Sequence, residues 1–150
     1  MKKILTLLLV VVGMFVLSAC NRSKKLKIGF AASTFQNPFF NDIKEGIEDA
    51  LKGTNYELIS LGADDDASKQ AGQIEDLIAQ GVKLLLINPV DSTTSGTKIK
   101  EANEAGIPVI TVDRSSNEGD VKAHIASDNV AGGKMAGEFL KSVCPVGNPV

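Results

Sequence analysis

Hydrophobic residues along the chain follow two alternating spacings, one typical of β-strands and one typical of α-helices. Short apolar runs predict strands over residues 26–30, 56–61, 83–88, 108–112 and 123–127. Apolar side chains that recur every three or four residues predict helices over residues 38–52, 66–80, 92–105 and 129–142. Strands and helices alternate through most of this pattern, as in β-α-β units. The sequence therefore predicts an α/β fold with a doubly wound parallel sheet.

Local signals mark where the predicted helices begin and end. Asn37 precedes Pro38, which places a capping residue before a proline at the first helical position. Gly53 and Gly81 are expected to end the first two helices. Residues 83–88 are almost continuously apolar, which predicts a central strand buried on both faces. The residues of the second helix that are expected to face the core are Ala67, Ala71, Ile74 and Ile78.

The first nineteen residues are typical of a secretory signal rather than of the folded domain. Two lysines precede an apolar run over residues 4–17, which is shorter than the roughly 20 residues of a membrane-spanning helix. The following Leu17-Ser18-Ala19-Cys20 resembles the lipobox of bacterial lipoproteins. We therefore expect residues 1–19 to be removed and the Cys20 thiol to carry a lipid. Residues 20–25 would then tether the domain to the extracytoplasmic face of the cell membrane. The alternative is a plain secretory signal in which Cys20 is incidental.

The chemistry that could bind a ligand follows the predicted strands. In a doubly wound sheet, ligands bind beyond the carboxyl ends of the strands. The turn after the first strand carries Ser33, Asn37 and adjacent aromatic residues, and the turn after the fourth strand carries Asp113 and Arg114. A sugar suits this mixture because its hydroxyls pair with carboxylate, amide and guanidinium groups while its C–H faces pack on aromatic rings. The competing readings are a helix start at Asn37, a core position for Phe40, and a surface ion pair at Asp113 and Arg114.

Composition excludes several other function classes. The formal net charge of −2 and the absence of Trp argue against a nucleic-acid-binding protein. A single histidine, His124, and two cysteines argue against a metal centre or a histidine-based catalytic triad. No glycine-rich dinucleotide fingerprint follows the first strand. The sequence therefore predicts a binding protein with no enzyme activity, no cofactor and no metal.

Four segments together resemble the periplasmic sugar-binding family of ABC transporters, and within it the ribose-binding members. The segments occur in the family's order and spacing, at residues 33–40, 85–92, 107–114 and 124–129. The resemblance implies that a monosaccharide, ribose or a similar sugar, is bound and delivered to an ABC permease. The positions that it implies for ligand contact are Ser33, Asn37, Phe39, Phe40, Asp113 and Arg114.

The resemblance also implies the domain organisation. Residues 26–127 would form the N-terminal sugar-binding lobe, Ser127 and Asp128 would lie at the hinge, and residues 128–150 would begin a second lobe. Family members have two complete lobes, so the sequence is expected to be truncated. Two alternatives stay open: a truncated remnant that binds nothing, and the sensor domain of a sugar-responsive repressor, which would carry a helix-turn-helix in place of the signal peptide.

Overall fold

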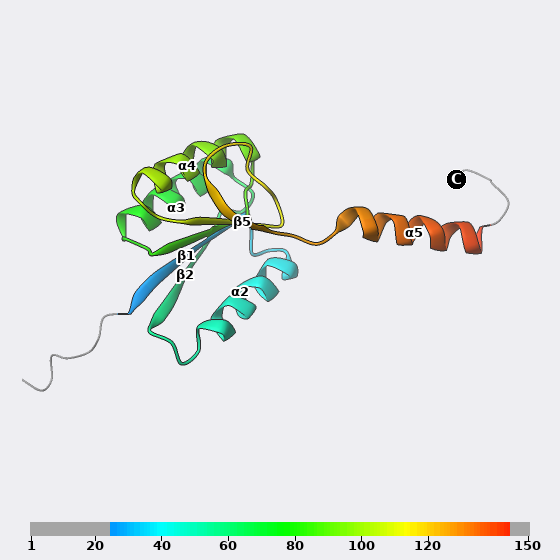
Figure 1. The fold of residues 1–150 in the computed structure, drawn as a ribbon, viewed down its shortest axis with the longest axis horizontal. Helices are drawn as coiled ribbons and strands as arrows, with labels where there is room; N and C mark the ends of the chain where they lie inside the picture. The colour runs from blue at the N-terminus through cyan, green and yellow to red at the C-terminus, as the bar shows by residue number, and fades with distance from the viewer. Residues whose placement is uncertain (1–24, 145–150) are drawn as a thin grey trace, which may run out of the picture.

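The computed structural model describes residues 25–144, in which one sheet of parallel strands has the order β2-β1-β3-β4-β5 (Figure 1). The strands are β1 (Leu26–Ala32), β2 (Tyr56–Gly62), β3 (Leu84–Ile87), β4 (Val109–Val112) and β5 (Val121–Ile125). The helices are α2 (Pro38–Leu51), α3 (Ala67–Ala79), α4 (Ser92–Glu104) and α5 (Asn129–Val143). The predicted α/β fold with a parallel sheet is confirmed.

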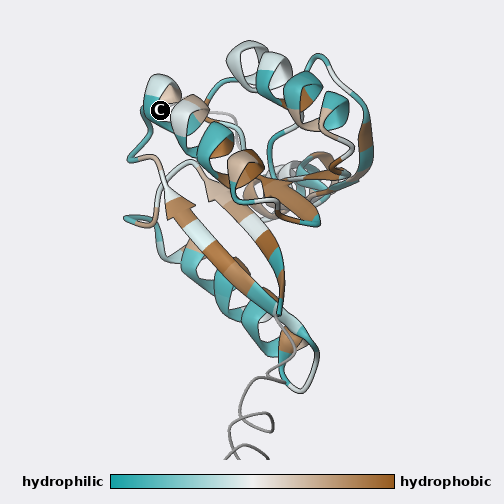
Figure 2. Cartoon of the chain, turned by 90° about the vertical axis from the view of Figure 1, so that its left-hand side faces the viewer, coloured by the Kyte–Doolittle hydropathy of each residue, from teal (hydrophilic) through white to brown (hydrophobic). Residues whose placement is uncertain are grey.

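The main core lies between the sheet and the pair α3 and α4, which cover one face, whereas α2 lies on the other face (Figure 1). Ile74 and Ile99 from the helices meet Leu85 and Ile87 from β3 in this core. Apolar residues accordingly concentrate in the strands, and the outer helix surfaces are mostly polar (Figure 2). β3 is the central strand of the sheet, as predicted, but only one of its faces is fully buried, because Leu84 and Leu86 are partly exposed. The physical reason is that α2 packs against β2 and leaves β3 partly open on that face.

The side of α3 that faces the core differs from the prediction, because it includes a polar residue, Gln70. The fully buried residues of this helix are Gln70, Ile74 and Leu77, whereas Ala67, Ala71 and Ile78 are half-buried. Gln70 is buried because its amide group hydrogen-bonds to backbone at the carboxyl ends of the strands. An amide that is fully hydrogen-bonded can occupy the core at little cost.

The fifth strand begins and ends two residues earlier than predicted. It pairs with β4 from Val121, with an irregular register between Val109 and Ile110. Residues 126–128 therefore lie outside the sheet and lead to α5. That helix buries none of its residues and stands apart from the sheet (Figure 1).

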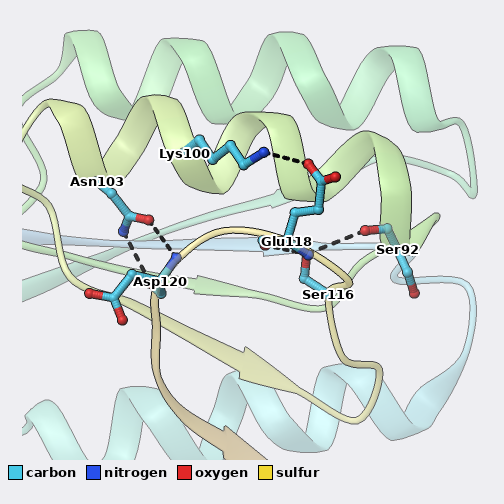
Figure 3. Close-up of polar contacts among 6 residues, drawn as sticks. All are labelled: Ser92, Lys100, Asn103, Ser116, Glu118 and Asp120. Carbon is cyan, nitrogen blue, oxygen red and sulfur yellow. Dashed lines mark hydrogen bonds and ion pairs between the residues drawn. The ribbon is translucent and has the colours of Figure 1, made fainter.

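The connection between β4 and β5 contains no helix and instead lies along α4 (Figure 3). Lys100 Nζ pairs with Glu118 Oε2 at 2.6 Å. Asn103 donates to the carbonyl of Asp120 at 3.1 Å and accepts from its N–H at 2.8 Å. These contacts hold the connection that begins at the fourth strand's turn, and they satisfy backbone groups that a helix would otherwise pair.

Replacing Gly119 by alanine should destabilise the domain. Gly119 has φ +88°, and an added Cβ would lie 2.4 Å from Ile99 Cγ2 in the core. Left-handed strain and overpacking each cost about 1–3 kcal/mol. We expect a clear loss in the free energy of unfolding measured with urea. Gly72→Ala is the matched control, because its added Cβ meets nothing within 4 Å. Equal stability of the two variants would contradict this packing.

Several predictions concern residues that the structure does not describe. The predicted signal peptide, the lipid site at Cys20, most of the tether and the last six residues lie outside the described part of the chain. Within residues 25–144, no helix has the length and apolar character needed to cross a membrane.

Candidate sugar-binding site

A cavity of about 270 Å³ lies at the carboxyl ends of β4 and β5, beside the start of α2. Its lining residues are Phe39, Ile43, Val112, Asp113, Ile125, Ala126 and Ser127. Residues distant in sequence therefore meet at the edge where a parallel sheet binds ligands. Three of them, Phe39, Asp113 and Ser127, were singled out by the sequence.

The aromatic residues that follow the turn after β1 lie in the first turn of α2 and differ in burial. Phe39 is 43% exposed, whereas Phe40 is 3% exposed and belongs to the core. The two rings meet edge to face with centroids 5.2 Å apart. Phe40 thus supports the Phe39 ring, which is the one that offers a surface to a ligand. Ligand contact by Phe40 stays a prediction.

Ser33 and Asn37 also lie at different depths in the turn after β1. Ser33 is fully buried, and its Oγ has no hydrogen-bond partner among the described residues. It therefore presents no atom at the open surface of the cavity. Asn37 is exposed, and its Oδ1 accepts the N–H of Phe39 at 3.0 Å as the cap of α2. The predicted helix start is confirmed, and a second role in ligand contact stays a prediction.

The turn after β4 has an unusual backbone at Asp113. This residue has φ +65°, in the left-handed region that costs most residues about 1–2 kcal/mol. Its N–H donates to the carbonyl of Ile125 at 2.8 Å, which ties the turn to β5. The next residue, Arg114, is exposed, and its Nη1 donates to the carbonyl of Pro89 at 3.2 Å. The turn therefore places Asp113 in the cavity lining, while the Arg114 side chain extends to the carbonyl of Pro89.

The predicted hinge residues lie between the sheet and α5. Ser127 and Asp128 are exposed, and Asp128 Oδ1 accepts the N–H of Ala131 at 2.8 Å as the cap of α5. A helix cap accounts for Asp128 in this structure. Hinge motion at these two residues stays a prediction.

Sequence reasoning missed two buried amide side chains beneath the site, Asn88 and Gln70. Asn88 was placed at the end of an apolar strand, and Gln70 was not among the residues of the second helix that were expected to face the core. The signal that could have identified Asn88 is a polar residue directly after a buried parallel strand, where the carboxyl ends of neighbouring strands need hydrogen-bond partners.

The acidic run after β2 lies outside the cavity. The hydrogen bond from the Lys69 ammonium, together with its positive charge, lowers the pKa of Asp64. Asp66 caps α3 by accepting the N–H of Lys69 at 3.0 Å. Asp64 is therefore paired with a lysine and Asp66 is used as a helix cap, as expected for a solvent-exposed loop without a binding role. Among the described residues, no cluster of three or more acidic, histidine or cysteine side chains could hold a metal ion.

A larger cavity, of about 450 Å³, lies at the opposite end of the sheet. It is lined by Leu51, Gly53 and Tyr56 with charged neighbours such as Lys52 and Glu57. The amino ends of the strands point toward it, whereas ligands of doubly wound sheets bind at the carboxyl ends. The smaller cavity is therefore the candidate site.

Comparison with known proteins assigns the fold to a family. Residues 28–147 match the profile of the periplasmic binding protein domain. The chain belongs to the periplasmic binding protein family. Both the predicted family and the predicted fold class are confirmed.

Relatives of this binding protein are described as sugar-import proteins. The "Ribose import binding protein" of Bacillus subtilis is 42% identical over 153 aligned residues, which cover 93% of this chain and 50% of the relative. The chain thus spans about half the length of this curated relative.

Solved structures show the same fold. A solute-binding protein from Clostridium phytofermentans, with bound β-D-glucose, is 32% identical with a TM-score of 0.74, covering 79% of this chain and 37% of the other. A Caulobacter myo-inositol-binding protein is 27% identical with a TM-score of 0.75, covering 84% of this chain and 43% of the other.

Proposed function

We propose that the chain forms the sugar-binding half of an extracytoplasmic solute-binding lipoprotein of an ABC importer, with ribose as its preferred ligand. The protein binds a monosaccharide without catalysis and delivers it to the permease. The observation that carries this proposal is the cavity in which the exposed Phe39 ring lies near the Asp113 carboxylate, with the Arg114 guanidinium next along the chain. The relatives named for ribose import support ribose over other monosaccharides.

The chemistry of this cavity matches the two sides of a sugar ring. The Phe39 ring offers an apolar face for C–H groups, as aromatic side chains do in many binding sites. Asp113 accepts hydroxyl hydrogens, and Arg114 donates in a fixed fork. Because charged partners make stronger hydrogen bonds, a sugar that leaves either one unpaired loses affinity.

Ligand-detected NMR tests the proposal on residues 21–150, which contain every described residue. Saturation of the protein should transfer to ribose more strongly than to galactose, xylose or glucose at equal concentration. Transfer to ribose should fall in Phe39→Ala, because the ring that packs on the sugar is lost. Equal transfer to all four sugars, unchanged by Phe39→Ala, would refute the assignment.

Lipid attachment is the second part of the proposal, and it concerns Cys20. In cells fed a labelled fatty acid, the protein should carry the label, and Cys20→Ser should abolish it. Cys144→Ser is the matched control. It should keep the label, because Cys144 lies after the end of α5, far along the chain from the Leu17-Ser18-Ala19-Cys20 motif. Equal labelling of the Cys20→Ser variant would contradict lipidation at that thiol.

A further inference from the structure

We propose that Asn88 is a positioning residue that fixes the two ligand-binding turns relative to each other. The first turn is residues 33–37, between β1 and α2, and it leads to Phe39 at the start of α2. The fourth turn is residues 113–114, after β4. This inference rests on the proposed sugar-binding function. Asn88 does not line the cavity but lies buried beneath it.

The Asn88 side chain contacts both turns from a fully buried position. Its Oδ1 accepts the N–H of Ser33, at the start of the first turn, at 3.3 Å. Its Nδ2 donates to the carbonyl of Val112 at 3.0 Å and reaches Asp113 Oδ2 at 3.4 Å. One amide group thus joins the ends of β1 and β4 across β3.

Only a side chain that both donates and accepts can make this connection. The first turn presents an N–H, and the fourth turn presents a carbonyl and a carboxylate. An amide supplies the oxygen acceptor and the nitrogen donor in one planar group. Because the amide is buried, loss of either hydrogen bond leaves an unpaired group without water to replace it.

Gln70 holds Asn88 in place from the helix side. Its Nε2 donates to the backbone carbonyl of Asn88 at 2.8 Å and to that of Ala31 at 3.3 Å. Its Oε1 accepts the N–H of Val90 at 2.9 Å. The backbone on either side of the Asn88 side chain is therefore fixed, so the amide stays aimed at the two turns.

The fourth turn needs such support because of its backbone. Asp113 lies in the left-handed region, and the contact from Asn88 Nδ2 pairs its carboxylate in that conformation. A residue held in an unfavourable conformation persists only where its surroundings determine it. The position of the carboxylate offered to a sugar therefore depends on the Asn88 amide.

Asn88→Asp tests the contact with each turn separately, because it keeps the acceptor for the first turn and removes the donor for the fourth turn. The carboxylate still accepts the Ser33 N–H, but it faces the Val112 carbonyl and the Asp113 carboxylate with no hydrogen to donate. The amide NMR signals of Asp113 and Arg114 should shift, while those of Asn37 and Phe39 stay near their original positions. Affinity for ribose should fall about tenfold or more when the same substitution is made in a two-lobed hybrid, in which residues 26–144 are joined to the remaining half of the Bacillus subtilis ribose import binding protein.

Two further variants distinguish positioning from general stability. Asn88→Ser removes the long amide altogether and should shift the signals of both turns. Ile99→Val removes a core methylene remote from the cavity and is the control; it should lower the melting temperature while leaving ribose affinity within about twofold of the original. A residue with a purely structural role would change ribose affinity only through stability, as Ile99→Val does. A large loss of ribose affinity in a folded Asn88 variant therefore indicates positioning.

The outcomes separate this inference from the proposed function. Ribose affinity of folded Asn88→Asp equal to that of the original protein would overturn the positioning role while leaving sugar binding intact. If the original protein shows no ribose binding, the proposed function fails. The positioning role is then still tested by the NMR signals of the protein without sugar, because unmoved Asp113 and Arg114 signals in Asn88→Asp would overturn it. Loss of folding in both Asn88 variants would also overturn it, by assigning Asn88 to the stability of the whole sheet.

Discussion

Residues 21–150 should bind ribose at least about a thousandfold more weakly than a two-lobed hybrid, a difference of about 4 kcal/mol. In the hybrid, residues 26–144 are joined to the remaining half of the Bacillus subtilis ribose import binding protein, of which this chain matches 50%. The reason is exposure. Asn37, Phe39 and Arg114 face open solvent in the described structure, so water competes for every hydrogen bond that a sugar would form.

Closure of two lobes removes that competition. Hinge closure around a ligand excludes water and adds contacts from the second surface. The original and hybrid proteins are compared by NMR titration and calorimetry, with the fully unfolded fraction measured in each. Ribose affinities within about tenfold of each other would contradict this account and would make the first lobe a sufficient binding module.

The same chain should self-associate, because α5 exposes its apolar side. Val130 is 85% exposed, Met135 is 70% exposed and Phe139 is 66% exposed. The edge strand β5 is largely exposed as well, and unpaired edges favour association between chains. Sizing chromatography of residues 21–150 should show species larger than a monomer, and the hybrid should elute as a monomer. A monodisperse monomer of residues 21–150 would contradict the prediction.

Arg114→Ala in the hybrid should weaken ribose binding by about 2–5 kcal/mol, the usual cost of truncating one partner of a buried charged hydrogen bond. The guanidinium already donates to the carbonyl of Pro89, which orients the side chain and lowers the entropy cost of using its remaining donors. Asp113→Ala should cost a similar amount, because sugar hydroxyls would lose their carboxylate acceptor. Calorimetry with ribose measures both losses.

Lys52→Ala is the matched control for Arg114→Ala. Lys52 is an exposed cation at the opposite end of the sheet, where it pairs with Asp49 at 2.5 Å. Exposed ion pairs of this kind contribute little, so ribose affinity and stability should stay close to those of the original hybrid. Unchanged ribose affinity in Arg114→Ala would remove the fourth turn from the site.

Periodicity predicted most of the fold because the elements of a parallel sheet are local patterns. Asn37 was recognisable as a cap since capping depends on the residue type next to a helix start. The bounds of β5 were predicted two residues too late, because they are set by its pairing with β4 and by the contact between Asn103 and Asp120. Contacts between segments distant in sequence leave no local signal.

The candidate site was predictable only in part for a similar reason. The rule that ligands bind at the carboxyl ends of parallel strands identified the turns that hold Phe39 and Asp113. The rule does not say how deeply each side chain is buried. Ser33 and Phe40 were therefore included among the candidate ligand contacts, with a core position for Phe40 left open, and both are buried. Asn88 was missed because its importance lies in three hydrogen bonds to other strands and turns, which exist only after folding.

The most direct measurement is an amide chemical-shift map of the hybrid during a ribose titration. The account predicts that the largest shifts occur at Phe39, Asp113 and Arg114, at the carboxyl edge of the sheet. It also predicts no shift at the larger cavity at the amino edge, where Gly53 and Tyr56 lie. Shifts that are largest at Gly53 and Tyr56, or absent from both edges at saturating ribose, would contradict it.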